Sequence, residues 1–276
     1  MPEEMRAMDR QFVKIEKGLG PQGRIAVVRF DRGDNINALS QQAMRELRDV
    51  PREFEDDLET SVVILTGSAR AFSAGFDLKD GDGRARDGLP IGERIHRQRL
   101  GPKMCKAWQD MDQVTIAAIE GHCIGGGAAL VVSLDFRTCG RSAHFRIPEV
   151  ELGMNMSWGS IPRMLALMGP ARTKQAVILA SDRIGAAEAL DWGLVENVVE
   201  DGQALAASME FAERIARQPP IPVRMSKASV NRLAHALDDL AAHMDADQNV
   251  LTGLTEDYRE GTAAFREKRK PSFKGK

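Results

Sequence analysis

The chain has 276 residues, a formal net charge of −2 and only 5% aromatic residues. This length is enough for one large domain with a sizeable core, or for a domain with an appendage. The nearly neutral charge argues against a general nucleic-acid or membrane-surface partner, and three scattered cysteines without CxxC or Cys/His spacing argue against a disulfide framework or a metal site.

Residues 1–10 are charged and lack the apolar core of a secretion signal. No apolar run in the chain approaches the roughly 20 residues of a membrane-spanning helix. We therefore expect a cytoplasmic protein with no membrane partner.

The first half of the chain alternates between β-rich runs and helical patterns. We expect strands at residues 25–30, 62–66, 115–119 and 136–139. Between the first two strands, apolar residues at helical spacing predict a helix over residues 40–58 with Ser40 as its N-cap. Strands that alternate with helices indicate crossover connections and a mostly parallel sheet, which is an α/β fold.

The second half of the chain is mostly helical in pattern. Helices are expected on both sides of Gly169-Pro170, and a short one should end at Gly193. A longer helix should end at the Pro219-Pro220 break. After that break, the pattern predicts two amphipathic helices, over residues 223–240 and 241–264.

A glycine run, Gly125-Gly126-Gly127, follows a hydrophobic strand and opens an apolar helix. The first turn of a helix has N–H groups without intrahelical acceptors, and glycine lets a ligand approach the main chain closely. Such a site attracts negative charge. The charge could be a bound phosphate or an oxyanion that forms only during a reaction.

A second glycine turn, Ala74-Gly75-Phe76, follows the preceding β-rich unit. Two converging backbone amides are the usual construction of an oxyanion hole. A carboxylate for acid–base work is offered by Glu149, which follows Pro148 after a short extended segment. The residue pattern by itself does not favour Glu149 over Glu151 or Glu120.

Several motifs occur in a family-like order and carry a resemblance over nearly the whole chain, from about residue 13 to residue 276. They are Asn37-Ala38-Leu39, residues 72–79, residues 121–127, Pro148-Glu149, Gly193-Leu194-Val195 and residues 265–271. With them the chain resembles the crotonase (enoyl-CoA hydratase/isomerase) superfamily. The resemblance implies a spiral of repeated ββα units over residues 1–200 that holds an acyl-CoA site. It also implies a C-terminal helical region, residues 201–276, that forms homotrimers or dimers of trimers and contacts CoA.

The resemblance also assigns roles to particular residues. The amides of Phe76 and Gly126 would hold the thioester oxygen, and Glu149 would be the acid/base. Four residues would contact the CoA moiety: Ala38, Lys79, Phe265 and Lys268. It implies an acyl-CoA substrate, no cofactor beyond the CoA moiety and no metal.

One position departs from the hydratases of the family, which have a second glutamate where this chain has Ala129. A single base is sufficient to move a 3-enoyl double bond to the 2-position, so the resemblance favours isomerisation, or else an atypical hydration. Two further alternatives are a catalytically weakened acyl-CoA-binding protein and a hydratase-lyase that acts on an aromatic enoyl-CoA.

Two other branches of the superfamily are disfavoured. The charge argues against RNA binding, and no serine follows the glycine run to serve as the nucleophile of a protease. The loop after Glu149 is unusual because it contains Met154, Met156 and Trp158, which could be core residues or walls of an acyl pocket.

Overall fold

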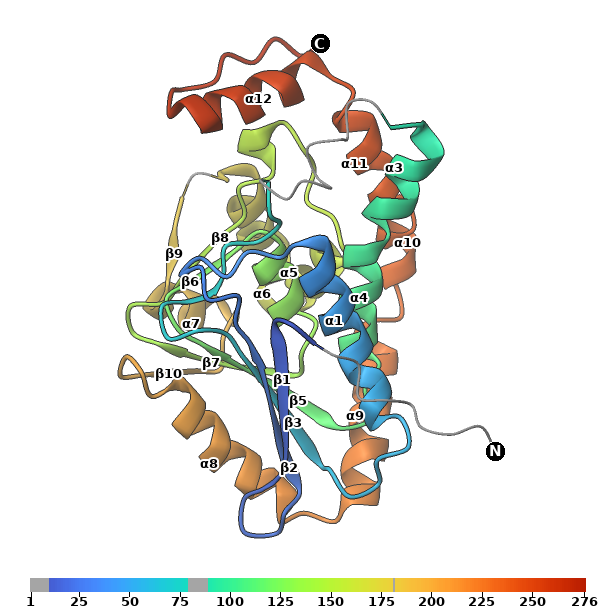
Figure 1. Ribbon diagram of the computed structural model, residues 1–276, viewed down its shortest axis with the longest axis vertical. Coiled ribbons are helices and arrows are strands. Elements are labelled where there is room, and N and C mark those ends of the chain that lie inside the picture. The colour runs from blue at the N-terminus through green and yellow to red at the C-terminus, as the bar shows by residue number, and fades with distance from the viewer. Residues whose placement is uncertain (1–9, 79–88, 181) are drawn as a thin grey trace.

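The computed structural model describes residues 10–78, 89–180 and 182–276. Two sheets and the helices around them form the α/β fold predicted from the strand–helix alternation (Figure 1). The larger sheet has six strands, in the order β1 (Val13–Leu19), β2 (Ile25–Phe30), β3 (Val62–Thr66), β5 (Val114–Ile119), β7 (Phe136–Gly140) and β10 (Asn197–Val199). Only β1 and β2 pair antiparallel, so the sheet is mostly parallel, as predicted.

The second sheet has the order β4 (Ala71–Ser73), β6 (His122–Ile124), β8 (His144–Arg146) and β9 (Ile184–Gly185). Each of β4, β6 and β8 follows a long strand of the first sheet, and these three pair in parallel. This repetition of a long strand and a short strand is the expected crotonase-like spiral. The sequence pattern did not predict the short strands individually, because three residues are too few to establish a period of two.

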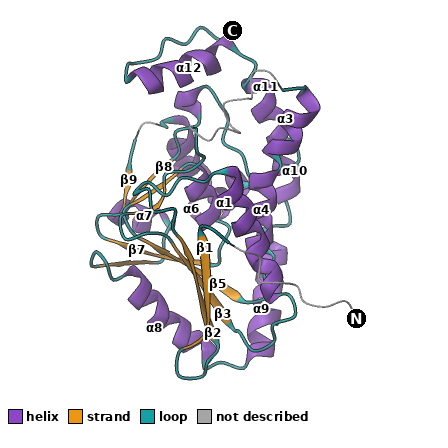
Figure 2. Cartoon of the chain, in the orientation of Figure 1, coloured by secondary structure: helices purple, strands orange, loops and turns teal. Residues whose placement is uncertain are grey.

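The long strands alternate their side chains between two cores. Val63, Leu65 and Ala117 point into the larger core, which also contains residues of α1 (Gln41–Asp49), α4 (Leu100–Gln109) and α5 (Gly126–Val131). Ile64 and Ile116 point to the opposite face, where α8 (Ala204–Ala216) covers the sheet (Figure 2). Because both faces are buried, these strands are hydrophobic along their whole length.

The helix predicted over residues 40–58 is shorter in the structure. Ser40 is its N-cap, because its side chain accepts a hydrogen bond from the Ala43 amide at 3.2 Å. Helix α1 ends at Asp49, and a 3₁₀ helix, η1 (Val50–Phe54), follows because Pro51 cannot continue the α-helical hydrogen bonds. The break predicted at Gly169-Pro170 is a kink inside α6 (Ser160–Ile178), where Gly169 has φ 72°.

Helix α7 (Ala186–Trp192) ends, as predicted, at Gly193, which is left-handed with φ 79°. Residues 91–109 had no predicted element and contain α3 (Ile91–Gln98) and α4. The prediction of two long C-terminal helices is wrong. The structure has four shorter ones: α9 (Pro220–Ala234), α10 (Asp238–Ala242), α11 (Asp245–Thr252) and α12 (Glu256–Glu267).

An N-cap explains the break between α11 and α12. The Thr255 side chain accepts a hydrogen bond from the Tyr258 amide at 3.1 Å and so starts α12. Helix α12 then packs on η3 (Val150–Leu152), the short 3₁₀ helix that follows Glu149. The C-terminal region therefore lies against the part of the chain that carries the predicted base. Within the described residues, no helix has both the length and the apolar character needed to cross a membrane.

Candidate active site

The glycine run lies where strand β6 ends and helix α5 begins, as its sequence context predicted. Gly125 has φ 52° and ψ −115°, a conformation that a side chain disfavours. Gly126 is the first residue of α5, so its N–H has no acceptor within the helix. This N–H can therefore bind an oxygen atom that carries negative charge.

The second glycine turn lies directly beside the first. Strands β4 and β6 are parallel neighbours, so the turns that follow them meet at one edge of the small sheet. A Cβ atom on Gly75 would lie 3.1 Å from the Gly126 nitrogen. The turn is fixed from its other side by the Leu39 amide, which donates to the Gly75 carbonyl at 2.7 Å. The Phe76 turn and the glycine run thus lie side by side.

Glu149 reaches the same place from strand β8, the next strand of the small sheet. The Gly125 amide donates to the Arg146 carbonyl at 2.9 Å, which ties β8 to the glycine run. A Cβ atom on Gly125 would lie only 2.8 Å from Glu149 Oε1, so the absence of a side chain there makes room for the carboxyl group. The other oxygen, Oε2, is buried and has no hydrogen-bond partner among the described residues.

Glu120 and Glu151, the two alternatives to Glu149, make contacts elsewhere. Glu120 Oε1 accepts a hydrogen bond from the Ala204 amide at 2.9 Å, at the start of helix α8. Glu151 forms an ion pair with Arg146. Of the three candidates, only Glu149 is placed against the glycine run with an oxygen that lacks a partner.

Burial raises the pKa of the Glu149 carboxyl to about 7, and the charge of Arg146 opposes this shift only in part. An acid or base whose pKa lies near the working pH can both take up and release a proton readily. The environment of Glu149 therefore suits proton transfer at neutral pH.

The raised pKa predicts a pH-dependent difference in stability between the protein and its Glu149→Gln variant. A folded-state pKa of about 7, above the ordinary 4.5, means that the folded protein binds this proton more tightly than the unfolded chain does. This contribution to stability is fully present below the ordinary carboxyl pKa and is lost as the pH rises through the folded-state value. The variant should therefore gain on the order of 3 kcal/mol relative to the wild type between acidic and mildly alkaline pH.

Urea unfolding of both proteins at pH 5 and pH 8 measures this difference. All other titrating groups are common to the two proteins, so their contributions cancel. Identical pH dependence of the two free energies of unfolding would show that the carboxyl group titrates normally.

The residues assigned to CoA by resemblance fall into three groups. Ala38 is buried next to the Phe76 turn, because the following residue, Leu39, forms a β-bridge with Phe76. Phe265 and Lys268 lie at the exposed C-terminal end of α12. Lys79 lies outside the described residues. In the described part of the chain, no cluster of three His, Cys, Asp or Glu side chains could hold a metal ion.

Two of the three large side chains in the loop after Glu149 are core residues. Met156 and Trp158 are buried and belong to the main core. The six-membered ring of Trp158 also lies against Gly126, because a Cβ atom there would be 2.5 Å from Cζ3. Gly101 of α4 contacts the same indole and was missed from the sequence, where Gly101-Pro102 looks like an ordinary loop signal.

Comparison with known proteins identifies the family of this chain and agrees with its fold. The sequence profile described as Enoyl-CoA hydratase/isomerase matches residues 20–276. The crotonyl-CoA hydratase of Syntrophomonas wolfei is 34% identical over 256 residues, which cover 92% of this chain and 96% of that protein. The short-chain-enoyl-CoA hydratase of Clostridium acetobutylicum is 33% identical over 265 residues, which cover 95% and 97%.

Solved structures also match the fold of this chain. The enoyl-CoA hydratase of Bacillus anthracis superimposes with a TM-score of 0.74 at 31% identity, over 96% of this chain and 100% of that one. The enoyl-CoA hydratase/isomerase of Pseudoalteromonas atlantica shares the fold, with a TM-score of 0.83 at 24% identity, over 96% and 100%. The chain belongs to the enoyl-CoA hydratase/isomerase family of the crotonase superfamily.

Proposed function

We propose that this protein transfers a proton on the acyl group of a CoA thioester, with Glu149 as the acid/base. The observation that carries the proposal is the Glu149 carboxyl group, which lies against Gly125 with a pKa of about 7. The amides of Phe76 and Gly126 would bind the thioester oxygen. Each such donor contributes about 2.7–4 kcal/mol of transition-state stabilisation in enzymes where one has been removed.

The reaction that one carboxylate serves best is the conversion of a 3-enoyl-CoA to a 2-enoyl-CoA. Glu149 would remove a proton from C2, and the electron pair would spread over a dienolate whose oxygen is held by the two amides. The same carboxyl group would then return the proton to C4. No second acid or base is needed, which agrees with a methyl group at Ala129, a fully buried position of the main core.

A second candidate is hydration of a 2-enoyl-CoA, favoured by the hydratase names of the two relatives described above. The resemblance that assigns Glu149 also gives the hydratases a second glutamate at the position of Ala129. Without it, Glu149 would have to activate the water and deliver the proton alone. We therefore rank isomerisation first.

Two substrates separate the candidates. With 3-enoyl-CoA, an isomerase forms the conjugated thioester, so its ultraviolet absorbance rises. With 2-enoyl-CoA, a hydratase consumes the conjugated thioester and forms 3-hydroxyacyl-CoA, which mass spectrometry identifies. We expect turnover of the 3-enoyl substrate to be the faster of the two. Binding of both thioesters without turnover of either would overturn the proposal in favour of an acyl-CoA-binding protein.

We also propose that Ala38, Lys79, Phe265 and Lys268 contact CoA, and that the protein acts in the cytoplasm as a homotrimer or a dimer of trimers. Support for the assembly comes from large apolar side chains on the C-terminal helical region that stay exposed in one chain. Leu233, Leu237 and Leu240 are 83%, 70% and 72% exposed. Apolar surface of this extent is typical of a contact with another subunit.

A further inference from the structure

The indole of Trp158 lies between two helices of the site. On one side it contacts Gly126, the first residue of α5, and on the other it contacts Gly101 of α4. A Cβ atom on Gly101 would lie 2.1 Å from Cε2 of the ring, and one on Gly126 would lie 2.5 Å from Cζ3. Only glycine at both positions leaves room for the ring where it stands.

The backbone of Trp158 is held in an unfavourable conformation. Trp158 and Gly159 have φ 64° and φ 65°, and the left-handed region is rare for a large side chain. Among the hydrogen bonds that hold this turn, two connect it to residues outside it. The Arg163 guanidinium donates to the Trp158 carbonyl at 2.9 Å, and the Gly159 amide donates to Asp245 Oδ2 of α11 at 2.7 Å.

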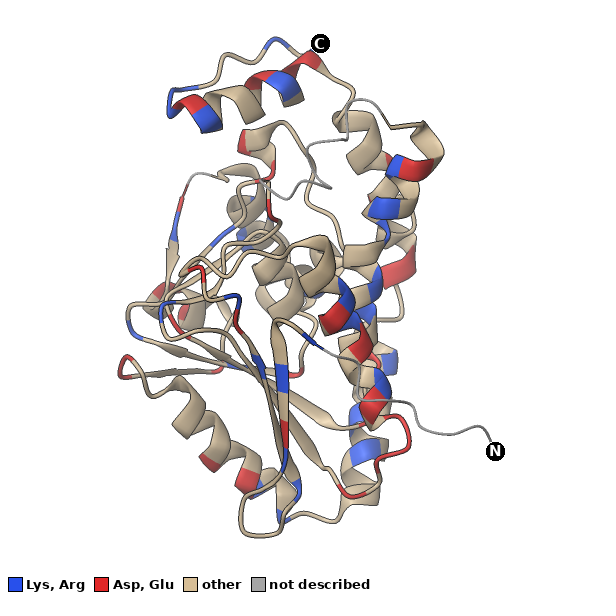
Figure 3. Ribbon diagram, viewed as in Figure 1, with Lys and Arg blue, Asp and Glu red and all other residues tan. Residues whose placement is uncertain are grey.

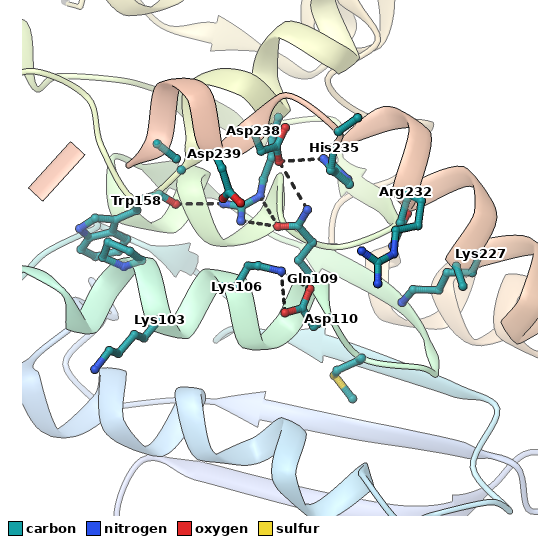
Figure 4. A pocket seen from close by; sticks show the side chains of 18 of the residues that line it. Lys103, Lys106, Gln109, Asp110, Trp158, Lys227, Arg232, His235, Asp238 and Asp239 are labelled. Carbon is teal, nitrogen blue, oxygen red and sulfur yellow. Dashed lines mark hydrogen bonds and ion pairs between the residues drawn. The ribbon is translucent and has the colours of Figure 1, made fainter. Parts of the chain in front are cut away.

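A cavity of about 760 Å³ lies beyond the indole, between α4 and the C-terminal helices α9 and α10. Trp158 is at one end of this cavity, and Lys103, Gln109 and His235 are among its other lining residues (Figure 4). Acidic and basic residues alternate along the helices around it (Figure 3) and are also among its lining residues. The ring therefore stands between the candidate oxyanion site and an open space.

We propose that the indole of Trp158 is the end wall of the acyl pocket and restricts the enzyme to short acyl chains. The inference rests on the proposed function, because it takes the Gly126 amide to hold the thioester oxygen. An acyl group bound there would have its first carbons near the ring edge that contacts Gly126. A longer chain would have to displace the indole, which the two glycines and the strained, hydrogen-bonded turn keep in place.

The test replaces Trp158 with Ala and compares a series of 3-enoyl-CoA and 2-enoyl-CoA substrates from four to twelve carbons. Removal of the wall joins the acyl pocket to the cavity and relieves the clash between a longer chain and a tightly packed ring. The ratio of kcat/KM for the long substrates to that for the four-carbon substrate should therefore rise by about tenfold or more. Affinities for saturated acyl-CoA thioesters of the same lengths give a readout that does not depend on turnover, and they should shift in the same direction.

Trp192→Ala is the matched control, because Trp192 and Trp158 are both 8% exposed but Trp192 does not line the cavity. It should lower stability without a change in the chain-length ratio. Trp158→Phe keeps most of the ring volume and should give a smaller shift, so it serves if the alanine variant does not fold.

The outcomes of this experiment separate the two proposals. A wild-type enzyme that already prefers long chains, or a Trp158 variant whose chain-length ratio is unchanged, would overturn the role of Trp158 and leave the proposed function standing. A wild type that turns over no enoyl-CoA of any length would overturn the proposed function itself.

Discussion

Glu149→Gln is expected to lower kcat for enoyl-CoA turnover by about 10²–10⁴-fold, the range that a positioned general acid or base contributes. Gln is nearly isosteric with Glu and cannot exchange a proton. Affinity for acyl-CoA should change little, since the CoA contacts proposed above lie elsewhere. The rates of both proteins are measured with the substrate that the wild type turns over, and their affinities with a saturated acyl-CoA thioester of the same length.

Glu151→Gln is the control, because Glu151 is two residues away and forms an ion pair with Arg146. Loss of a partly exposed ion pair costs about 0–1 kcal/mol, so this variant should stay within a few-fold of the wild-type rate. If Glu149→Gln kept wild-type kcat, the base would have to be another group.

A second large effect is expected from Gly125→Ala. The new Cβ would lie 2.8 Å from Glu149 Oε1, and φ 52° at this residue disfavours a side chain. The carboxyl group or the glycine run must then shift. Since a misplacement of about 1 Å can cost 10²-fold in rate, we expect kcat/KM to fall by about that factor, with a loss of at least about 1–2 kcal/mol of stability from the backbone conformation.

Gly202→Ala is the control that separates the loss of rate, caused by contact with Glu149, from the loss of stability, caused by the backbone conformation. Gly202 has φ 80°, and a Cβ atom there would meet no other atom within 4 Å. This variant should show the backbone cost in urea unfolding but retain full activity. Equal activity losses in the two variants would mean that the Gly125 effect arises from general destabilisation rather than from contact with Glu149.

The long strands and the caps of the helices could be predicted from the sequence because their causes are local. Ile64 and its neighbours form a continuous apolar run of strand length, and Ser40 and Gly193 are residues that helix ends prefer. The breaks between the C-terminal helices could not be predicted from periodicity. Apolar residues recur across them, and the interruption appears only as a new cap at Thr255 and in the packing of α12 on η3.

The sequence by itself determined that two glycine turns follow consecutive β-units and that a carboxylate follows Pro148, and the family motifs assigned them to an acyl-CoA site. The residue pattern apart from those motifs left Glu149, Glu151 and Glu120 open. The tertiary structure shows that Glu149 is the one that lies against the glycine run, because the three carboxylates differ in their neighbours and not in their chemistry. The tertiary structure also decided the surroundings of Trp158. Its contact with Gly101 and Gly126 joins residues far apart in the chain, and such contacts are set by how helices pack rather than by local residue preference.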